Sequence, residues 1–211
     1  IADLPPIDFV VISHNHYDHL DIGTLKTLAE RSPATRFFVG LGNDELLRNH
    51  GIENVTAFDW GQSTTVGPLR IYCLPSQHWS KRTLNDTRQT LWAAWAVQSA
   101  NRKFYFGGDT GYFMGFARIG ERFGHFDLAA VPIGAYQPVA MMRASHLNPE
   151  EAVVAATDLR ARTMIAMHFG TFDLSDEPLD EPPTRFLNAA RKSGVPADRA
   201  WVFKIGETRD F

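Results

Sequence analysis

The sequence predicts a mixed α/β fold of the α+β kind, in which β-hairpins and β-α-β units occur in the same chain. Some apolar, strand-like runs are joined by tight turns, whereas others are separated by helix-length segments. The chain has 211 residues, of which 44% are hydrophobic and 21% charged, as is typical of a soluble globular domain. We therefore expect a single domain, 1–211, with neither a simple parallel Rossmann order nor an all-β sandwich.

The first half of the chain is expected to alternate strands with helices before it turns to hairpins. Asp21 is expected to cap one helix and Asn43 another, because both residue types accept hydrogen bonds from the amides of the first turn. The expected elements are strands at 7–13, 36–39 and 55–58, helices at 21–31 and 44–50, and hairpins that pair 64–66 with 69–74 and 90–98 with 103–106.

The second half is expected to contain most of the longer helices. The clearest helix start is Asn148-Pro149-Glu150-Glu151, which has Asn at the cap, Pro at the first helical position and Glu at the third. The acidic, proline-rich segment 176–183 is interpreted as a solvated connection. The expected elements are helices at 113–123, 149–159 and 182–193, and strands at 128–131, 163–167 and 201–204.

Charge and hydropathy exclude several classes of protein. The net charge of −3 and the lack of a long basic run argue against a nucleic-acid-binding surface. No apolar stretch approaches the roughly 18 residues that a membrane-spanning helix needs. The single cysteine, Cys73, forbids an internal disulfide and is interpreted as a buried small hydrophobe. We expect a cytoplasmic or membrane-peripheral protein whose N-terminal part is missing, since the sequence starts at Ile1 rather than Met.

A dense group of metal-binding side chains follows the apolar run Phe9–Ile12. His14 and His16 are two positions apart in an extended segment and therefore point to the same side. Asp18 and His19 follow one turn later, so one short segment offers four metal ligands. The chain has only 8 histidines, so finding three of them within six positions is not an effect of composition. We interpret this segment as half of a two-metal site.

Three single residues at the ends of expected strands supply the other half. They are His78, Asp109 and His168, and the glycines before Asp109 would let the backbone approach a ligand closely. Nitrogen and oxygen ligands without a thiolate favour zinc, with manganese or iron as alternatives. We expect two Zn²⁺ ions, one held by His14, His16 and His78 and the other by Asp18, His19 and His168, with the Asp109 carboxylate as the bridge.

These seven residues form the pattern of the metallo-β-lactamase superfamily. The chain most closely resembles the N-acylphosphatidylethanolamine-hydrolysing phospholipase D family and its bacterial relatives. The resemblance implies an αββα sandwich with a dizinc site at its edge, and phosphodiester hydrolysis on a lipid head group. It also implies that the chain lacks the first N-terminal strands of that fold. The segments that carry the resemblance, besides the first motif, are 77–83, 108–112, 126–136, 146–152 and 168–172.

The expected reaction uses a hydroxide that bridges the two metals and attacks phosphorus. Asp18 either orients this nucleophile and takes its proton or serves as a ligand alone. The resemblance places His146 at the pocket, where it would bind the phosphate or protonate the leaving group; the alternative is a loop histidine bonded to backbone. Lys81 and Arg82 either steer an anionic substrate or are ordinary surface charges, and Tyr136 is expected to line the pocket.

Two other functions stay open at this point. One is a dizinc hydrolase of another bond, such as a lactone, thioester or β-lactam; a β-lactamase normally uses a cysteine ligand, and His19 and His168 argue against that. The other is a binding or regulatory protein that has lost catalysis. For the phosphodiesterase we expect a phospholipid or another small phosphodiester as substrate and no nucleic acid. A peripheral membrane contact and a homo-oligomer are left open.

Overall fold

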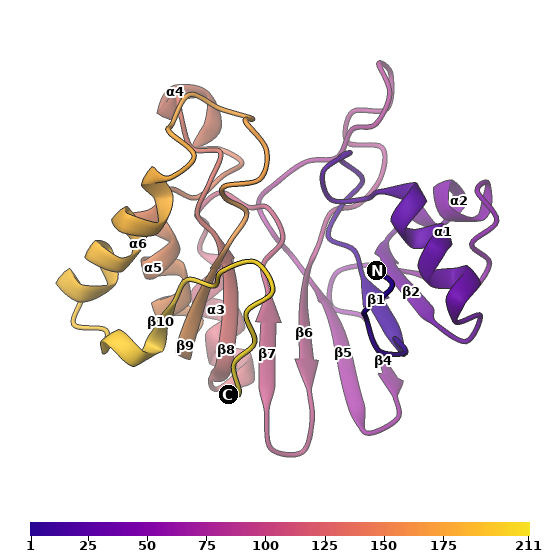
Figure 1. Cartoon of the computed structure of the whole chain (residues 1–211), viewed down its shortest axis with the longest axis horizontal. Coiled ribbons are helices and arrows are strands. Elements are labelled where there is room, and N and C mark those ends of the chain that lie inside the picture. Colours follow the sequence, from indigo (N-terminus) through magenta and orange to yellow (C-terminus); the bar gives the residue numbers. More distant parts are fainter. The chain divides into compact units, whose positions relative to one another are not determined.

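The computed structural model describes all residues, 1–211, and has the expected mixed α/β fold with helices flanking its sheets (Figure 1). The chain divides into two compact units, and the division falls within strand β6 (Ala94–Gln98). Unit 1 contains Ile1–Pro75 and Trp79–Trp95, and unit 2 contains Ser76–His78 and Ala96–Phe211. No helix is long and apolar enough to cross a bilayer.

Unit 1 is built around a parallel sheet in the order β1 (Phe9–Val11), β2 (Arg36–Gly40), β3 (Val55–Phe58). Helices α1 (Ile22–Arg31) and α2 (Asn43–Arg48) connect these strands, as the β-α-β spacing predicts. The Asp21 side chain caps α1 by accepting a 2.7 Å hydrogen bond from the Thr24 amide. The core of this half comprises Ile12, Leu20, Leu25, Phe37, Val39, Leu47, Ile52 and Val55.

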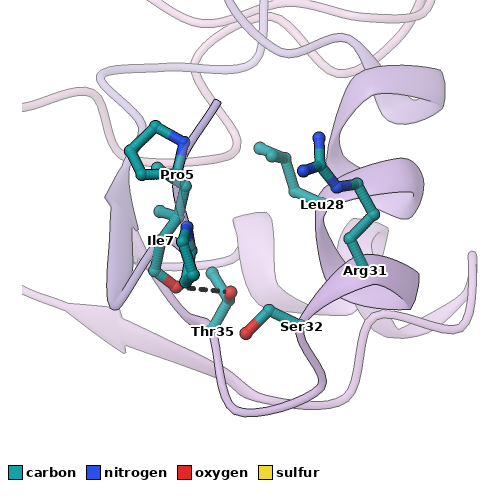
Figure 2. A pocket seen from close by; sticks show the side chains of 7 residues that line it. Pro5, Ile7, Leu28, Arg31, Ser32 and Thr35 are labelled. Atoms are coloured by element: carbon teal, nitrogen blue, oxygen red, sulfur yellow. Dashed lines mark hydrogen bonds between the residues drawn. The ribbon is translucent and has the colours of Figure 1, made fainter. Parts of the chain in front are cut away.

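Unit 1 also contains the predicted antiparallel hairpin of β4 (Ser63–Val66) and β5 (Leu69–Leu74). Cys73 lies on β5 and is fully buried, which confirms its interpretation as a small hydrophobe. Near the start of the chain is a cavity of about 150 Å³, lined by Pro5, Pro6, Ile7, Leu28, Arg31, Ser32 and Thr35 (Figure 2). No residue predicted to form the functional site lines this cavity.

Unit 2 is built around the parallel strands β7 (Lys103–Phe106), β8 (Phe126–Pro132), β9 (Ala161–Met167) and β10 (Ala200–Trp201), in that order. Every residue of β8 is buried, as is typical of a central parallel strand. Helix α5 (Pro149–Asp158) packs on β8 and β9 and contacts both α3 (Gly115–Phe123) and α6 (Glu181–Lys192). Two short helices, α4 (Val139–Met142) and η1 (Ala197–Arg199), complete the unit.

Local capping follows the sequence prediction at one helix and departs from it at another. Asn148 and Glu151 form the complete capping box predicted for α5. Asn43, by contrast, lies inside α2 and does not cap it; its amide donates hydrogen bonds of 2.9 Å to the carbonyls of Gly40 and Leu91 instead. The last predicted strand, 201–204, is reduced to the two-residue β10, and 202–204 have no regular structure.

Candidate metal centre

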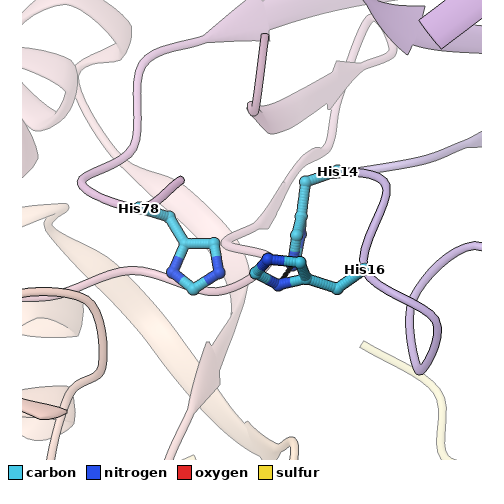
Figure 3. Close-up of side chains that lie close together, drawn as sticks. All are labelled: His14, His16 and His78. Carbon is cyan, nitrogen blue, oxygen red and sulfur yellow. Dashed lines mark hydrogen bonds between the residues drawn. The ribbon is translucent and has the colours of Figure 1, made fainter. Parts of the chain in front are cut away.

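In unit 1 the histidines of the first motif come directly after β1 and lie close together. His14 is buried, and its Nδ1 atom forms a 2.9 Å hydrogen bond with the Ser13 hydroxyl. Its Nε2 atom lies 2.8 Å from Nδ1 of His16, so both nitrogens are presented at one place (Figure 3, which also draws His78). The Trp79 ring packs edge-on to His16 at 4.5 Å between centroids.

Asp18 and His19 follow on a helical turn, as the motif predicts. The amides of His19 and Leu20 both donate to the carbonyl of His16, at 3.1 and 2.9 Å. This turn brings the His19 ring to 4.2 Å from the His14 ring and places His19 Nε2 3.2 Å from an oxygen of Asp18. One segment therefore gathers four metal-competent side chains within unit 1.

Asn15, within this motif, and Arg82, outside it, hold the backbone of the motif in place. Asn15 is 2% exposed, and its side-chain oxygen accepts a 2.9 Å hydrogen bond from the amide of Lys81. The Arg82 guanidinium donates to the carbonyls of Asn15 and Leu20 and stacks on the Tyr17 ring at 4.1 Å. The expectation that Arg82 contacts substrate stays a prediction, but its guanidinium supports the motif. Lys81 is half-buried.

In unit 2 three histidines surround one buried carboxylate, that of Asp109. Oxygen Oδ2 of Asp109 lies 3.8 Å from His78 Nε2 and 3.8 Å from His146 Nδ1. Oxygen Oδ1 lies 3.3 Å from His168 Nε2. Ligand atoms of His78, Asp109 and His146 all lie within 4.8 Å of one another, so this group alone could hold a cation. His146, which was expected to be catalytic, thus lies close enough to Asp109 to serve as an alternative metal ligand.

Close backbone packing explains the glycines around Asp109. A Cβ atom on Gly111 would lie 2.7 Å from the carbonyl oxygen of Arg143, so only glycine fits there. The Gly111 amide donates to the Gln77 carbonyl at 2.8 Å, which ties the loop of His78 to that of Asp109. On the outer side of the site, His78 Nδ1 forms a 2.9 Å hydrogen bond with the Ser145 carbonyl, which orients the ring and leaves Nε2 on the side of Asp109.

His168 directly follows β9 and has a left-handed backbone conformation, with φ of 58°. This conformation is uncommon for any residue other than glycine and is concentrated at functional sites. A Cβ atom on Gly134, in the loop after β8, would lie only 2.2 Å from the His168 carbonyl oxygen. The absence of a side chain at Gly134 therefore allows the two loops to meet at His168.

The loop after β8 is held by a carboxylate that sequence reasoning missed. Glu177 lies in the segment interpreted as a solvated connection, yet it is only 9% exposed and accepts hydrogen bonds from the amides of Ala135, Tyr136 and Gln137. Burial by itself would raise the pKa of Glu177, but the hydrogen bonds from Gln137, Ser175 and Tyr136 outweigh it and lower the pKa.

Tyr136 is buried, and its hydroxyl donates a 2.7 Å hydrogen bond to Glu181. Burial, followed by this hydrogen bond, raises the pKa of the Tyr136 hydroxyl well above its usual value. The Arg185 guanidinium packs over the Tyr136 ring at 4.7 Å and also pairs with Glu181. Contact between Tyr136 and substrate stays a prediction; the contacts that the structure shows are those with Glu181 and Arg185.

The donor set fits a divalent transition metal. All the expected ligands are imidazoles or carboxylates, which suit Zn²⁺, Mn²⁺ and Fe²⁺. Asp109 presents its two oxygens to different histidines, as a carboxylate that serves two cations would. The Nδ1 atom of His78 is held by the Ser145 carbonyl, and such a second hydrogen bond is usual for a histidine that binds metal.

Comparison with known proteins identifies relatives of this chain. The profile described as "Beta-lactamase superfamily domain" matches residues 1–169. The N-acyl-phosphatidylethanolamine-hydrolyzing phospholipase D 1 of Caenorhabditis elegans is 44% identical over 184 residues, which cover 82% of this chain and 52% of that protein. The mitochondrial protein of the same description from Saccharomyces cerevisiae is 34% identical over 218 residues, which cover 100% of this chain and 46% of that protein. The chain thus spans about half the length of these relatives.

A solved structure supports the fold. Igni18, described as a novel metallo hydrolase from the archaeon Ignicoccus hospitalis, superimposes with a TM-score of 0.74. The match covers 96% of this chain and 78% of that structure at 23% sequence identity. Similarity at this level of identity concerns the architecture alone, and it agrees with the fold class that the sequence predicts.

Proposed function

Because the chain belongs to the beta-lactamase superfamily, we propose that it is a dinuclear zinc-dependent phosphodiesterase of phospholipase D type. The proposed substrates are N-acylphosphatidylethanolamine-like lipids. The substrate class follows from the sequence similarity to the two phospholipases, since the fold by itself is compatible with many reactions.

The observation that carries the proposal is the environment of Asp109. This carboxylate is 3% exposed, and three histidines surround it, two near one oxygen and the third near the other. A buried carboxylate among imidazoles is costly unless charges balance it, and a pair of cations would balance it. This arrangement supports Asp109 as the bridging ligand of a two-metal site.

We assign the remaining ligands by the type and position of their side chains. His14, His16 and His78 would hold one cation, and Asp18, His19 and His168 would hold the other. His78 and His168 face different oxygens of Asp109, which supports assigning them to different cations. In unit 1, Asp18 stays beside His19, which supports assigning these two to the same cation. Zn²⁺ suits this set best, and Mn²⁺ or Fe²⁺ could take its place.

Bound metals would supply a water with a lowered pKa and would neutralise charge that develops on the phosphoryl group. In D-type cleavage, oxygen from water bonds to phosphorus, and the bond from phosphorus to the head-group oxygen breaks. Asp18, which lies beside His19, would accept the proton of the water, and His146 would donate a proton to the departing oxygen. Lys81 would attract the anionic substrate. The products are phosphatidate and an N-acylethanolamine.

Metal analysis and product identification together test this function. The purified chain should contain close to two equivalents of zinc or another transition metal per protein. On incubation with N-acylphosphatidylethanolamine, mass spectrometry should detect phosphatidate and N-acylethanolamine, and dialysis against a chelator should abolish both. Hydrolysis of a lactone or thioester panel without release of phosphatidate would favour another hydrolase. Metal-free protein prepared under non-chelating conditions, with no turnover, would favour a non-catalytic role.

A further inference from the structure

The carboxylate of Glu177 binds a run of three backbone amides in unit 2. Oxygen Oε1 accepts from Ala135 at 2.5 Å and from Tyr136 at 3.2 Å, and Oε2 accepts from Gln137 at 2.9 Å. Ala135 has a left-handed conformation, with φ of 64°, so these amides converge on one point as in an anion-binding nest. The chain therefore fills this anion-binding site with its own side chain.

The loop that Glu177 holds is the one that contacts the backbone of His168. The Ile133 amide extends the pairing of β8 with β9 by donating to the Met167 carbonyl at 3.0 Å. The next residue, Gly134, lies so close to the His168 carbonyl oxygen that a Cβ atom would be 2.2 Å from it. Any movement of this loop would therefore displace the peptide of His168.

The segment that runs from His168 to Glu177 ends against the loop that follows β8. After β9 the chain passes through His168, leaves the sheet, and returns so that the Asp176 amide donates to the Gln137 carbonyl at 3.3 Å, next to the Glu177 contacts. The left-handed conformation of His168 is unfavourable, and such a conformation persists only where the surrounding structure determines it. The contacts of Glu177 provide that constraint, because they join the end of this segment to the loop that packs against the His168 backbone.

We propose that Glu177 is a positioning residue for His168: it fixes the loop 134–137 against the His168 backbone and so holds the imidazole in the orientation that faces Asp109. This inference rests on the proposed role of His168 as a metal ligand. Glu177 itself would touch neither metal nor substrate. Glu177 would orient a metal ligand without binding the metal. The loss of such a residue typically weakens metal binding about 10- to 100-fold.

The experiment compares Glu177→Gln, Glu177→Ala and His168→Ala with the unaltered chain. Glutamine keeps the shape and one acceptor oxygen, whereas alanine removes every contact. Glu121→Gln is the matched control, because Glu121 is an exposed glutamate on α3 of the same unit. Each variant is stripped of metal and titrated with Zn²⁺ against a chromophoric chelator to obtain two dissociation constants. Hydrogen exchange of the peptide that covers 133–137 is followed in parallel.

The expected result is selective weakening of one of the two sites. Glu177→Gln should raise one dissociation constant about 10-fold and Glu177→Ala up to about 100-fold, with the other constant unchanged. His168→Ala should affect the same site, exchange at 133–137 should become faster in both Glu177 variants, and Glu121→Gln should match the unaltered chain.

The results that would overturn the proposal differ from those that would overturn the proposed function. If His168→Ala weakens one site and a folded Glu177→Gln leaves both constants unchanged, the positioning role is wrong. If Glu177→Gln does not fold, the residue supports the whole unit and not one ligand, which also refutes the proposal. If His168→Ala keeps both metals at normal affinity, the ligand assignment of the proposed function is what fails.

Discussion

Arg82 donates a 2.7 Å hydrogen bond from Nη1 to the backbone carbonyl of Leu20, and the same atom donates one of 3.0 Å to the carbonyl of Asn15. These two carbonyls stand at either end of the segment that carries His16, Asp18 and His19. A planar guanidinium can bridge two such acceptors because its donors are fixed in one plane. Arg82 therefore acts as a brace across the first half of the candidate metal centre.

Replacing Arg82 should loosen this half of the site. We expect Arg82→Ala to lower the free energy of unfolding by about 1.5–3 kcal/mol, the range for a hydrogen bond to a charged group, and to weaken metal binding about 10-fold. Arg82→Lys should restore only part of this loss, since an ammonium lacks the planar group that stacks on the Tyr17 ring. Urea denaturation and zinc titration measure the two effects. Arg70→Ala, at an exposed arginine of β5, is the control; equal losses in both variants would show that the brace is unimportant.

Asp109→Asn should remove metal without unfolding the protein. The amide nitrogen cannot act as a ligand, so one of the two oxygens that face the histidines is lost. We expect the zinc content to fall to about one equivalent or less and the proposed phosphodiesterase activity to fall at least about 100-fold.

Asp127→Asn is the matched control for that variant. Asp127 is also buried in unit 2, but it accepts from the Lys103 amide and pairs with Arg162 at the opposite end of β7 and β8 from Asp109. This control should lose stability and keep its metal. Normal metal content and activity in Asp109→Asn would refute the bridging role.

Gly134→Ala should destabilise the protein far more than an average glycine substitution. The added Cβ would lie 2.2 Å from the His168 carbonyl oxygen, and backbone on both sides must move to relieve the clash. We expect a loss of about 3 kcal/mol or more, with weaker metal binding, measured by urea denaturation and zinc titration.

Gly23→Ala is the comparison for Gly134→Ala. Gly23 lies in α1, where a Cβ would make only an ordinary 3.4 Å contact with Asp21. This change should be neutral or stabilising by about 0.5–1 kcal/mol, since glycine is unfavourable within a helix. Similar losses at the two positions would show that the loop after β8 has room to adapt.

The sequence predicted best those features that depend on the local spacing of residues. His14 and His16 share a side because they are two residues apart in an extended segment, and Asp21 and Asn148 cap helices through contacts within one turn. Asp109 and His168 were predicted to lie together because each follows a strand, and the structure places His168 Nε2 3.3 Å from Asp109 Oδ1. In each case the relevant partner is nearby or the position follows from the order of strands.

The sequence was least informative where the partner is a distant backbone group. Arg82 and Glu177 are charged residues in polar loops, and their partners are carbonyls and amides that carry no sequence signal. The same holds for Asn43, which bonds to the Leu91 carbonyl instead of capping α2. Such contacts depend on the tertiary fold, so local patterns favour the wrong role for these side chains.

Cys73 should be unreactive in the native protein. The residue is fully buried, and its burial, followed by the nearby Asp59 charge, raises the pKa of the thiol to about 12. The thiolate that attacks a disulfide reagent is therefore almost absent at neutral pH. Ellman's reagent should find no thiol in the folded chain and one equivalent in guanidinium. Rapid labelling without denaturant would contradict the burial of β5.

The stability of the metal-free protein should fall in acid partly through Glu177. The folded-state pKa of this carboxyl lies below its ordinary value of 4.5, so the ionised group stabilises the fold above that pH. This stabilisation is lost as the pH falls from about 4.5 through the folded-state pKa. Glu177→Gln lacks the titrating group, so its deficit relative to the unaltered chain should be largest at neutral pH and should shrink in acid. Urea denaturation of both metal-free proteins at several pH values, with Glu121→Gln as control, measures this difference; a deficit that stays constant would show that the charge of Glu177 does not contribute.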